Sequence, residues 1–245
     1  MKKTQNLFNT WGKITGKHYT DKQWLLSKWE VFEDMDWPDE KVDCMLQTIQ
    51  DGLQLRPQDI LLDLGCGGGW ILDRIKPLVS DVIGVDFSFE MIHHARDTFP
   101  QEKLLCGKIG QLPLGDNICD KVLCYFVFIN YETDEMVYAS IRDIMRVLKP
   151  GGRALVGQLP DKDLSHLYDK AKEAYLAHYL ETHSEEKSLR DIHRIPQKLY
   201  DRKSLEIFLE QENIFYQFRD SFNPFYRAGQ PETIPWRFDL ILEKQ

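Results

Sequence analysis

The sequence predicts an α/β fold built on a mostly parallel sheet with helices on both faces. The short apolar run Ile60–Leu64 leads straight into the glycine-rich turn Gly65–Gly69, and Trp70–Ile75 then shows helical spacing. Such continuous apolar runs are typical of parallel strands, which are buried on both faces. A second buried strand is predicted over Asp81–Phe87, and strands and helices alternate as far as Gly157. This alternation predicts an open sheet joined by crossover helices.

Apolar spacing and turn residues predict the remaining elements. Before the first strand, Trp24, Trp29 and Phe32 indicate a helix with an apolar face, and a second helix runs through Met45 to Leu53. Ser88 is placed to cap a helix over Ser88–Arg96. Later in the chain we expect a helix ending at Leu148-Lys149, a turn at Pro150–Gly152, a strand over Ala154–Gly157, a helix over Asp201–Glu210, and strands over Ile214–Phe218 and Trp236–Leu242.

The glycine turn and the helix after it indicate a cofactor site of the nucleotide type. Glycines lack a Cβ, so a ligand can approach the backbone closely, and the first N–H groups of a helix lack partners. The dinucleotide fingerprint G-x-G-x-x-G would need a glycine at position 70, where this chain has Trp70. A glycine-rich turn with a purely structural role is the alternative.

Several ordered stretches resemble the class I S-adenosylmethionine-dependent methyltransferases. Asp63–Gly69 resembles their first motif, D/E-x-G-x-G-x-G, and Gly107–Leu114 resembles their G-D-A-x-x-L-P segment. Asp120–Asn130 resembles their fourth strand with the segment after it, and Ile144–Arg153 resembles their helix and Pro-Gly-Gly turn. The resemblance implies a Rossmann-like sheet of seven strands, mostly parallel with an antiparallel last strand. It also implies S-adenosylmethionine as the cofactor and S-adenosylhomocysteine as the product.

Asp86 is the expected ribose-binding residue. It ends the second strand about 20 positions after the glycine turn, where a carboxylate accepts hydrogen bonds from both ribose hydroxyls. A helix N-cap is its alternative role, but Ser88 is available for that cap, which leaves Asp86 free for a ligand. Phe87 would then form an apolar wall near the adenine.

The segment after the third strand departs from the family pattern at one position. Lys108 stands where the family usually has the acid that binds the adenine amino group, so we expect the backbone at Lys108 and Ile109 to contact the adenine edge. The cofactor residues implied by the resemblance are Asp63, Gly65, Cys66, Gly67, Asp86, Phe87, Met91, Lys108, Ile109, Tyr125 and Phe126.

The chain is predicted to consist of a core and two additions. Residues 41–160 and 200–245 form the cofactor-binding core, residues 1–40 a helical aromatic segment, and residues 161–199 a helical insertion. Aromatic residues recur in the insertion at helical spacing. A helix face that packs against the rest of the protein shows the same pattern, so packing is the alternative role. We expect both additions to form a lid over the substrate. The predicted substrate-binding residues are Trp11, Tyr19, Tyr168, Tyr175 and Arg194.

Methyl transfer from a sulfonium needs alignment and exclusion of water, and only an acceptor that is hard to ionise needs a general base. Candidate bases are His18, His166, His178 and His193, with Tyr131 as a positioning group; surface or packing roles are the alternative for each histidine. Arg194, Arg227 and Arg237 are candidates to fix a carboxylate or phosphate of the substrate, with surface or strand-edge cations as the alternative.

Composition narrows the function classes. The formal net charge of -8 over 245 residues argues against a protein that grips nucleic-acid backbone. Five cysteines show no zinc spacing, and no metal is expected; Cys106, Cys119 and Cys124 are predicted to be buried, reduced thiols. With no apolar run of membrane-spanning length and no signal-peptide core, we expect a cytoplasmic protein, monomeric or homodimeric.

The leading functional prediction is methyl transfer to an oxygen or nitrogen of a small molecule. RNA or protein methylation, and cofactor binding without methyl transfer, are the alternatives. Asn223–Tyr226 looks like the N-P-P-Y motif of amino-group methylases, but it follows the sixth strand instead of the fourth, so a turn is predicted there.

Overall fold

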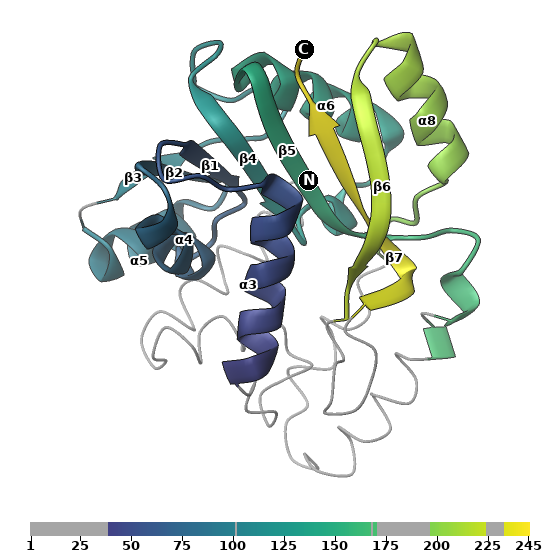
Figure 1. Ribbon diagram of the computed structural model, residues 1–245, viewed down its shortest axis with the longest axis horizontal. Coiled ribbons are helices and arrows are strands. Elements are labelled where there is room, and N and C mark those ends of the chain that lie inside the picture. Colours follow the sequence, from purple (N-terminus) through teal and green to yellow (C-terminus); the bar gives the residue numbers. More distant parts are fainter. Residues whose placement is uncertain (1–38, 101, 168, 171–196, 224–232) are drawn as a thin grey trace.

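A computed structural model describes residues 39–100, 102–167, 169–170, 197–223 and 233–245 (Figure 1). These residues form a seven-stranded sheet with the order β3-β2-β1-β4-β5-β7-β6. The strands are β1 Ile60–Leu64, β2 Asp81–Asp86, β3 Lys103–Cys106, β4 Cys119–Tyr125, β5 Leu148–Pro160, β6 Phe215–Phe222 and β7 Thr233–Glu243. Strands β1 to β5 pair in parallel, whereas β7 is antiparallel to both β5 and β6. The predicted fold class is confirmed.

Helices cover both faces of the sheet, and each face has its own apolar core. The described helices are α3 Asp39–Leu53, α4 Trp70–Ile75, α5 Phe89–Thr98, α6 Asp134–Val147 and α8 Arg202–Gln211, with 3-10 turns η1 Lys76–Leu78 and η2 Phe128–Asn130. Helix α3 crosses in front of the sheet in Figure 1, and its core with α4 and α5 includes Leu61, Leu123 and Leu155. Helices α6 and α8 pack on the other face, where Val122 and Val156 are buried. Alternate residues of β4 and β5 therefore enter opposite cores, as strand geometry requires.

Two of the predicted helices begin with a capping side chain, and the cap at Ser88 was predicted from the sequence. The Ser88 hydroxyl accepts a hydrogen bond from the Met91 N–H at 3.3 Å, and the Asp201 carboxylate accepts one from the Ser204 N–H at 3.2 Å. Both residues are therefore N-caps, which satisfy backbone donors that the helix itself leaves without partners. Strands β6 and β7 are longer than the predicted ranges because they pair with each other over much of their length.

Helix α6 ends earlier than the sequence suggested. Its last residue is Val147, and Leu148 is already extended (φ -65°, ψ 138°) because it pairs with Cys119 of β4. The Pro150–Gly152 turn lies within β5, between the Leu148 and Arg153 pairings. Gly151 supplies its positive φ of 75°. The predicted helix end at Leu148-Lys149 is therefore wrong, although the turn residues were correctly identified.

The predicted burial of one cysteine is also wrong. Cys119 and Cys124 of β4 are fully buried, but Cys106 is exposed. Cys106 is the last residue of β3, which lies at the edge of the sheet and pairs only with β2. A residue at the end of an edge strand is covered on fewer sides, and the sequence pattern does not reveal which strands are edges.

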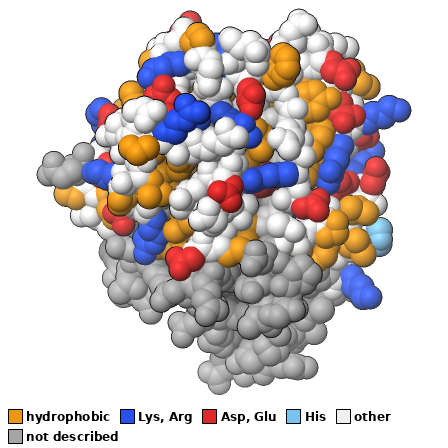
Figure 2. Space-filling view, in the orientation of Figure 1, with side chains coloured by type: hydrophobic (Ala, Val, Ile, Leu, Met, Phe, Trp, Pro, Cys, Tyr) orange, Lys and Arg blue, Asp and Glu red, His pale blue; other side chains and the backbone are white. Residues whose placement is uncertain are grey.

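The described helices include none with the length and apolar character that a membrane span requires. On the face shown in Figure 2, acidic and basic side chains are interspersed over the described part of the surface.

An ion pair between the half-buried Arg219 and the fully buried Asp239 joins β6, β7 and α3. The fully buried Asp239 carboxylate accepts hydrogen bonds from the Arg219 Nε and Nη2 at 3.2 and 3.1 Å. The same guanidinium donates to the Thr48 carbonyl at 2.7 Å, and Asp239 also accepts from the Ser221 hydroxyl and from the Gln158 N–H. Burial raises the pKa of Asp239, while Ser221 and Arg219 act in the opposite direction. The pair therefore holds three elements together around one buried charge.

We expect Arg219→Ala to destabilise the protein strongly, because it leaves the Asp239 carboxylate buried without its cation. Removing one partner of a buried pair costs about 3–5 kcal/mol in the free energy of unfolding. A carboxyl with a raised pKa binds its proton more tightly in the folded state, so the loss should be largest near about pH 8 and shrink towards about pH 5. Urea unfolding at both pH values measures this.

Arg142→Ala is the matched control, since Arg142 pairs with Glu212 on the exposed side of α6 at 2.8 Å. It should leave the urea midpoint unchanged. Equal losses in the two variants, or a loss in Arg219→Ala that does not depend on pH, would contradict the role given to Asp239.

Candidate cofactor site and active site

The predicted cofactor residues lie at the carboxyl ends of neighbouring parallel strands. The chain leaves β1 towards β2, and it leaves β4 in the opposite direction towards β5, although β1 and β4 are neighbours. Open α/β sheets bind ligands at such a switch point, outside the carboxyl ends of the strands. The glycine turn follows β1, Asp86 ends β2, Lys108 follows β3 and Tyr125 ends β4. These residues come from four adjacent strand ends.

The glycine turn is pinned between β2 and the segment after β4. The N–H groups of Gly65 and Cys66 both donate to the Val85 carbonyl, at 2.7 and 3.1 Å. Gly65 has φ 79°, and a Cβ on it would lie 2.3 Å from Val127 Cγ2. Gly69 has φ 85° and donates its N–H to the Cys66 carbonyl at 2.9 Å, which closes the turn. Glycine is therefore required at position 65 by both backbone conformation and space.

Asp86 holds the glycine turn at the end of β2. It is 4 % exposed, and its Oδ2 accepts a hydrogen bond from the Gly67 N–H at 2.9 Å. Its Oδ1 accepts one from the Ser88 N–H at 2.9 Å. The predicted Ser88 cap is confirmed, but Asp86 is not left free by it, because the backbone on either side of the crevice uses both oxygens. A carboxylate has about four lone-pair sites, so about two can still accept ribose hydroxyls.

The segment after β3 forms a tight turn next to Asp86. The Gly107 N–H donates to the Asp86 carbonyl at 2.9 Å, and the Gln111 N–H donates to the Lys108 carbonyl at 3.1 Å. Gly110 has φ 91° within this turn. The Lys108 side chain is exposed, whereas Ile109 is half-buried against the core. The exposed Lys108 side chain therefore does not cover the backbone of the turn, and contact of that backbone with the adenine edge stays a prediction.

The residues that end β4 are tightly packed. Tyr125 is buried, its ring lies against Gly157, and its hydroxyl accepts a hydrogen bond from Gln158 Nε2 at 3.4 Å. Burial raises the pKa of Tyr125 well above its ordinary value, with Asp239 adding to the effect. Phe126 has φ 59° and its ring meets that of Tyr125 edge to face at 4.9 Å between centroids. The positive φ turns the chain sharply away from the sheet at this point.

The other predicted cofactor residues lie beneath or beside the turn. Asp63, Cys66 and Met91 are 4 %, 9 % and 1 % exposed, and Phe87 is half-buried. Trp70, which argued against a dinucleotide, is buried at the start of α4 and stacks with Arg74, whose Cζ lies 4.0 Å from the ring centroid. Sequence reasoning missed Val127, which contacts Gly65; a single valine in an apolar segment carries no signal of that contact.

Most predicted substrate and catalytic residues fall outside the described ranges. These are Trp11, His18, Tyr19, Tyr168, Tyr175, His178, His193, Arg194 and Arg227. His166 is described and exposed. Tyr131 stacks on Phe128 with 4.6 Å between ring centroids, and its hydroxyl lies 2.8 Å from Ser140 Oγ of α6. Burial raises the pKa of Tyr131 above its ordinary value, which disfavours its ionisation as a base.

Arg237 is neither a surface residue nor on an edge strand. It is 4 % exposed in β7, which lies between β5 and β6. Its Nη1 lies 3.4 Å from both oxygens of Gln158, and its Nη2 donates to Gln197 Oε1 at 3.0 Å. Gln158 has φ 68° in the β5 bulge. The alternative offered for this arginine from the sequence is therefore wrong.

A polar hollow lies at the amino ends of β1, β4 and β5, whereas the predicted cofactor residues lie at the carboxyl ends of the strands. Arg56, Lys121 and Arg153 line it, together with Asp59 and Asp120. None of the predicted cofactor residues lies there. Within the described ranges, no group of three or more His, Cys, Asp or Glu side chains is arranged to hold a metal ion.

Comparison with known proteins agrees with this geometry. Residues 62–156 match the family model described as a methyltransferase domain. The malonyl-[acyl-carrier protein] O-methyltransferase of Erwinia pyrifoliae is 31% identical over 123 residues, which are 50% of this chain and 44% of that protein. An uncharacterized methyltransferase of Mycobacterium bovis is 36% identical over 93 residues, 38% of this chain and 37% of that protein. The chain thus spans less than half the length of these curated relatives.

Solved structures share the fold. The magnesium protoporphyrin IX methyltransferase of Synechocystis, with bound S-adenosylhomocysteine, superposes with a TM-score of 0.54 at 16% identity, covering 84% of this chain and 82% of that one. The PH0226 protein of Pyrococcus horikoshii reaches a TM-score of 0.61 at 16% identity, covering 86% and 93%. Residues 62–156 thus match a methyltransferase domain, and the solved structures show the same fold over most of the chain.

Proposed function

We propose that the protein transfers the methyl group of S-adenosylmethionine to an oxygen or nitrogen of a small-molecule acceptor by in-line displacement. The observation that carries the proposal is the arrangement of Gly65, Gly67 and Asp86 at the switch point between β1 and β4. The turn offers bare backbone, and the buried carboxylate beside it has acceptor capacity left for two hydroxyls. These features suit a cofactor with a ribose and no phosphate.

The residues of the chain would act by holding and aligning the reactants. Bound S-adenosylmethionine supplies a methyl group already activated by the sulfonium, so alignment and exclusion of water carry most of the catalysis. The buried Tyr125 and the half-buried Phe126 would form an apolar wall beside the transfer path. A general base is needed only for an acceptor that does not ionise easily. The described residues offer no strong candidate, because the Tyr131 hydroxyl is already engaged by Ser140.

The way in which the two ends of the insertion are held supports a small acceptor. Its two ends are joined: the Tyr200 N–H donates to the Pro160 carbonyl at 2.8 Å, and the Lys162 N–H donates to the Tyr200 carbonyl at 2.9 Å. Asp161 is buried and accepts a hydrogen bond from Arg202 Nε at 2.6 Å. These contacts hold both ends of the insertion at the carboxyl end of β5. A segment anchored there is well placed to cover a small acceptor and keep water out.

The names of two similar proteins indicate two different kinds of methyl acceptor. One is named for O-methylation of a malonyl carrier protein, and a structural neighbour is named for methylation of a porphyrin. A screen with S-adenosylmethionine labelled in the methyl group, given a low-molecular-weight metabolite extract or the macromolecular fraction, tests the proposal. Label should appear in a small molecule. Label in RNA or protein would replace the acceptor class, and cofactor binding without transfer to either fraction would contradict the enzymatic role.

Excision of residues 165–196, with a short Gly-Ser linker in their place, is expected to preserve cofactor binding and abolish turnover. The design keeps Asp161 and Tyr200, so the anchoring contacts remain intact. A flexible linker of this kind adds little loop-closure entropy. S-adenosylhomocysteine affinity by calorimetry and methyl transfer to the acceptor found in the screen are measured in parallel. Unchanged turnover and acceptor affinity would remove the lid role.

A further inference from the structure

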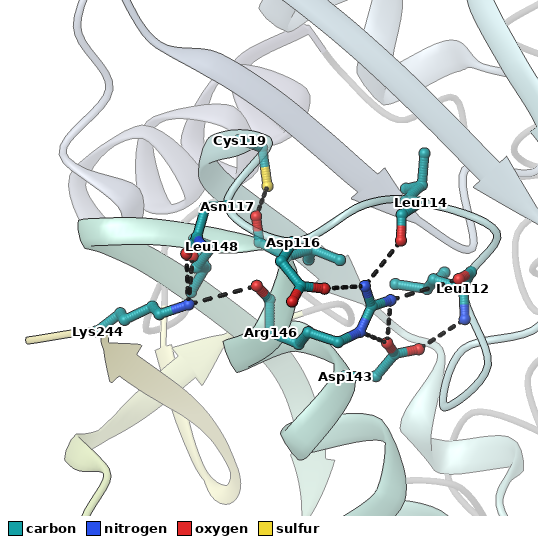
Figure 3. Close-up of polar contacts among 10 residues, drawn as sticks. Leu112, Leu114, Asp116, Asn117, Cys119, Asp143, Arg146, Leu148 and Lys244 are labelled. Atoms are coloured by element: carbon teal, nitrogen blue, oxygen red, sulfur yellow. Dashed lines mark hydrogen bonds and ion pairs between the residues drawn. The ribbon is translucent and has the colours of Figure 1, made fainter.

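The segment between β3 and β4 is fastened to α6 by a network of polar contacts (Figure 3). The Asp143 carboxylate, on α6, accepts a hydrogen bond from the Leu112 N–H at 2.7 Å. Its other oxygen accepts from Arg146 Nε and Nη2, at 3.0 and 2.6 Å. Asp143 is 7 % exposed. One carboxylate therefore joins the segment to the guanidinium of Arg146, one turn further along the helix.

The guanidinium of Arg146 also contacts the segment directly. Its Nη1 donates to the Leu114 carbonyl at 2.7 Å and to the Asp116 carboxylate at 2.8 Å, and its Nη2 donates to the Leu112 carbonyl at 3.4 Å. Three consecutive anchor points, at alternate residues of the segment, thus converge on one side chain (Figure 3). A guanidinium has five donors in a rigid fork, which lysine cannot reproduce.

The backbone of the same helix end is tied to the C-terminal strand. Lys244 Nζ, beyond β7, donates to the Asn117 side-chain oxygen at 2.8 Å and to the Leu148 carbonyl at 2.7 Å. The Asn117 and Ile118 N–H groups donate to the Arg146 and Val147 carbonyls at 3.1 and 2.8 Å. The far end of the segment is therefore fixed independently of the Arg146 side chain. Loss of that side chain should loosen the part near Leu112 more than the part near β4.

The part near Leu112 includes the turn that follows β3 and is bonded to Asp86, the predicted ribose-binding residue. The Lys108–Gln111 turn, defined by the hydrogen bond between these residues, lies between Gly107, bonded to the Asp86 carbonyl, and Leu112, bonded to Asp143. A Cβ on Gly110 would lie 3.5 Å from Ser140 Oγ, so the turn also packs on α6. One end of the turn is thus set by the ribose-binding strand and the other by Asp143 and Arg146.

We propose that Arg146, acting through Asp143 and Leu112, is a positioning residue that aligns the Lys108–Gln111 turn with the adenine of the cofactor. The inference rests on the proposed function, together with the sequence-based prediction that the backbone at Lys108 and Ile109 contacts the adenine edge. With lysine at position 108, no acidic side chain holds the adenine amino group there. The position of the backbone turn then determines how well it can form hydrogen bonds with the adenine edge.

Arg146→Lys tests this by comparing two ligands, S-adenosylhomocysteine and S-inosylhomocysteine. The second has a carbonyl in place of the amino group, which reverses the hydrogen-bond pattern of that edge. The wild-type protein should prefer the adenosyl compound. In Arg146→Lys the dissociation constant for the adenosyl compound should rise about three- to tenfold, the effect of one lost hydrogen bond, while that for the inosyl compound stays the same.

Arg142→Ala is the control. Arg142 also lies on α6, but it forms its ion pair with Glu212, away from the Lys108–Gln111 turn. It should retain the wild-type preference. Thermal unfolding establishes that each variant is folded. A general loosening would weaken both ligands equally, and that result, or unchanged affinity for both, would overturn the positioning role. Absence of S-adenosylhomocysteine binding by the wild-type protein would instead show that the proposed function has failed.

Discussion

Replacing Asp86 with alanine is expected to weaken S-adenosylhomocysteine binding by more than about 100-fold. The change removes the acceptors for the Gly67 and Ser88 N–H groups, and buried donors left without partners cost about 1–3 kcal/mol each. It also removes the two acceptor sites assigned to the ribose, and hydrogen bonds to a charged group are worth about 1.5–3 kcal/mol each. Calorimetric titration with S-adenosylhomocysteine measures the loss.

Asp81→Asn is the matched control, since Asp81 begins the same strand and pairs at the surface with Lys103. Its affinity should equal that of the wild type. Asp86→Asn keeps the size of the side chain and guards against simple unfolding of the alanine variant. Retained affinity in both Asp86 variants would remove Asp86 from the cofactor site.

Gly65→Ala is expected to destabilise the protein and to lower cofactor affinity by at least about tenfold. The left-handed conformation costs a residue with a Cβ about 1–2 kcal/mol, and overpacking against Val127 adds about 1–3 kcal/mol. Because Gly65 donates to the Val85 carbonyl, relief of the clash would move the whole turn relative to β2. Urea unfolding and ligand titration measure the two effects separately.

Gly151→Ala separates the cost of the left-handed backbone conformation from the cost of the contact with Val127. Gly151 has φ 75°, close to that of Gly65, but a Cβ on it meets nothing within 4 Å. This variant should show the conformational cost alone and bind cofactor normally. Adding Val127→Ala to Gly65→Ala should recover part of the lost stability. Equal losses in Gly65→Ala and Gly151→Ala would show that contact with Val127 is unimportant.

The residue pattern was sufficient to predict β1 and β2, whereas β4 was predicted from the family resemblance. Strand β1 occupies Ile60–Leu64 as predicted, because a strand buried on both faces is continuously apolar and the glycines after it mark its end. The antiparallel last strand was predicted by family resemblance, not by the residue pattern, since period and composition do not specify strand direction. The Ser88 cap followed from local hydrogen-bond chemistry, which depends on a few neighbouring residues.

Contacts between distant residues could not be predicted in this way. Asp239 stands alone in the apolar run Phe238–Leu242, a signal that a buried charge is present, but its partner Arg219 lies on another strand. Cys106 looked like a core residue because its position on an edge strand depends on strand order. Asp86 ends β2 as predicted, but its bonds to Gly67 and Ser88 depend on how the two loops meet.

Hydrogen–deuterium exchange of the full chain, with and without S-adenosylhomocysteine, tests the proposed cofactor site most directly. We expect slower exchange in peptides that contain Gly65–Gly69, Asp86–Ser88 and Lys108–Gln111, with no change in β6, the edge strand farthest from β3. Binding of S-adenosylhomocysteine without protection of the first two peptides would contradict it, because the ligand would then lie outside the crevice between β1 and β4.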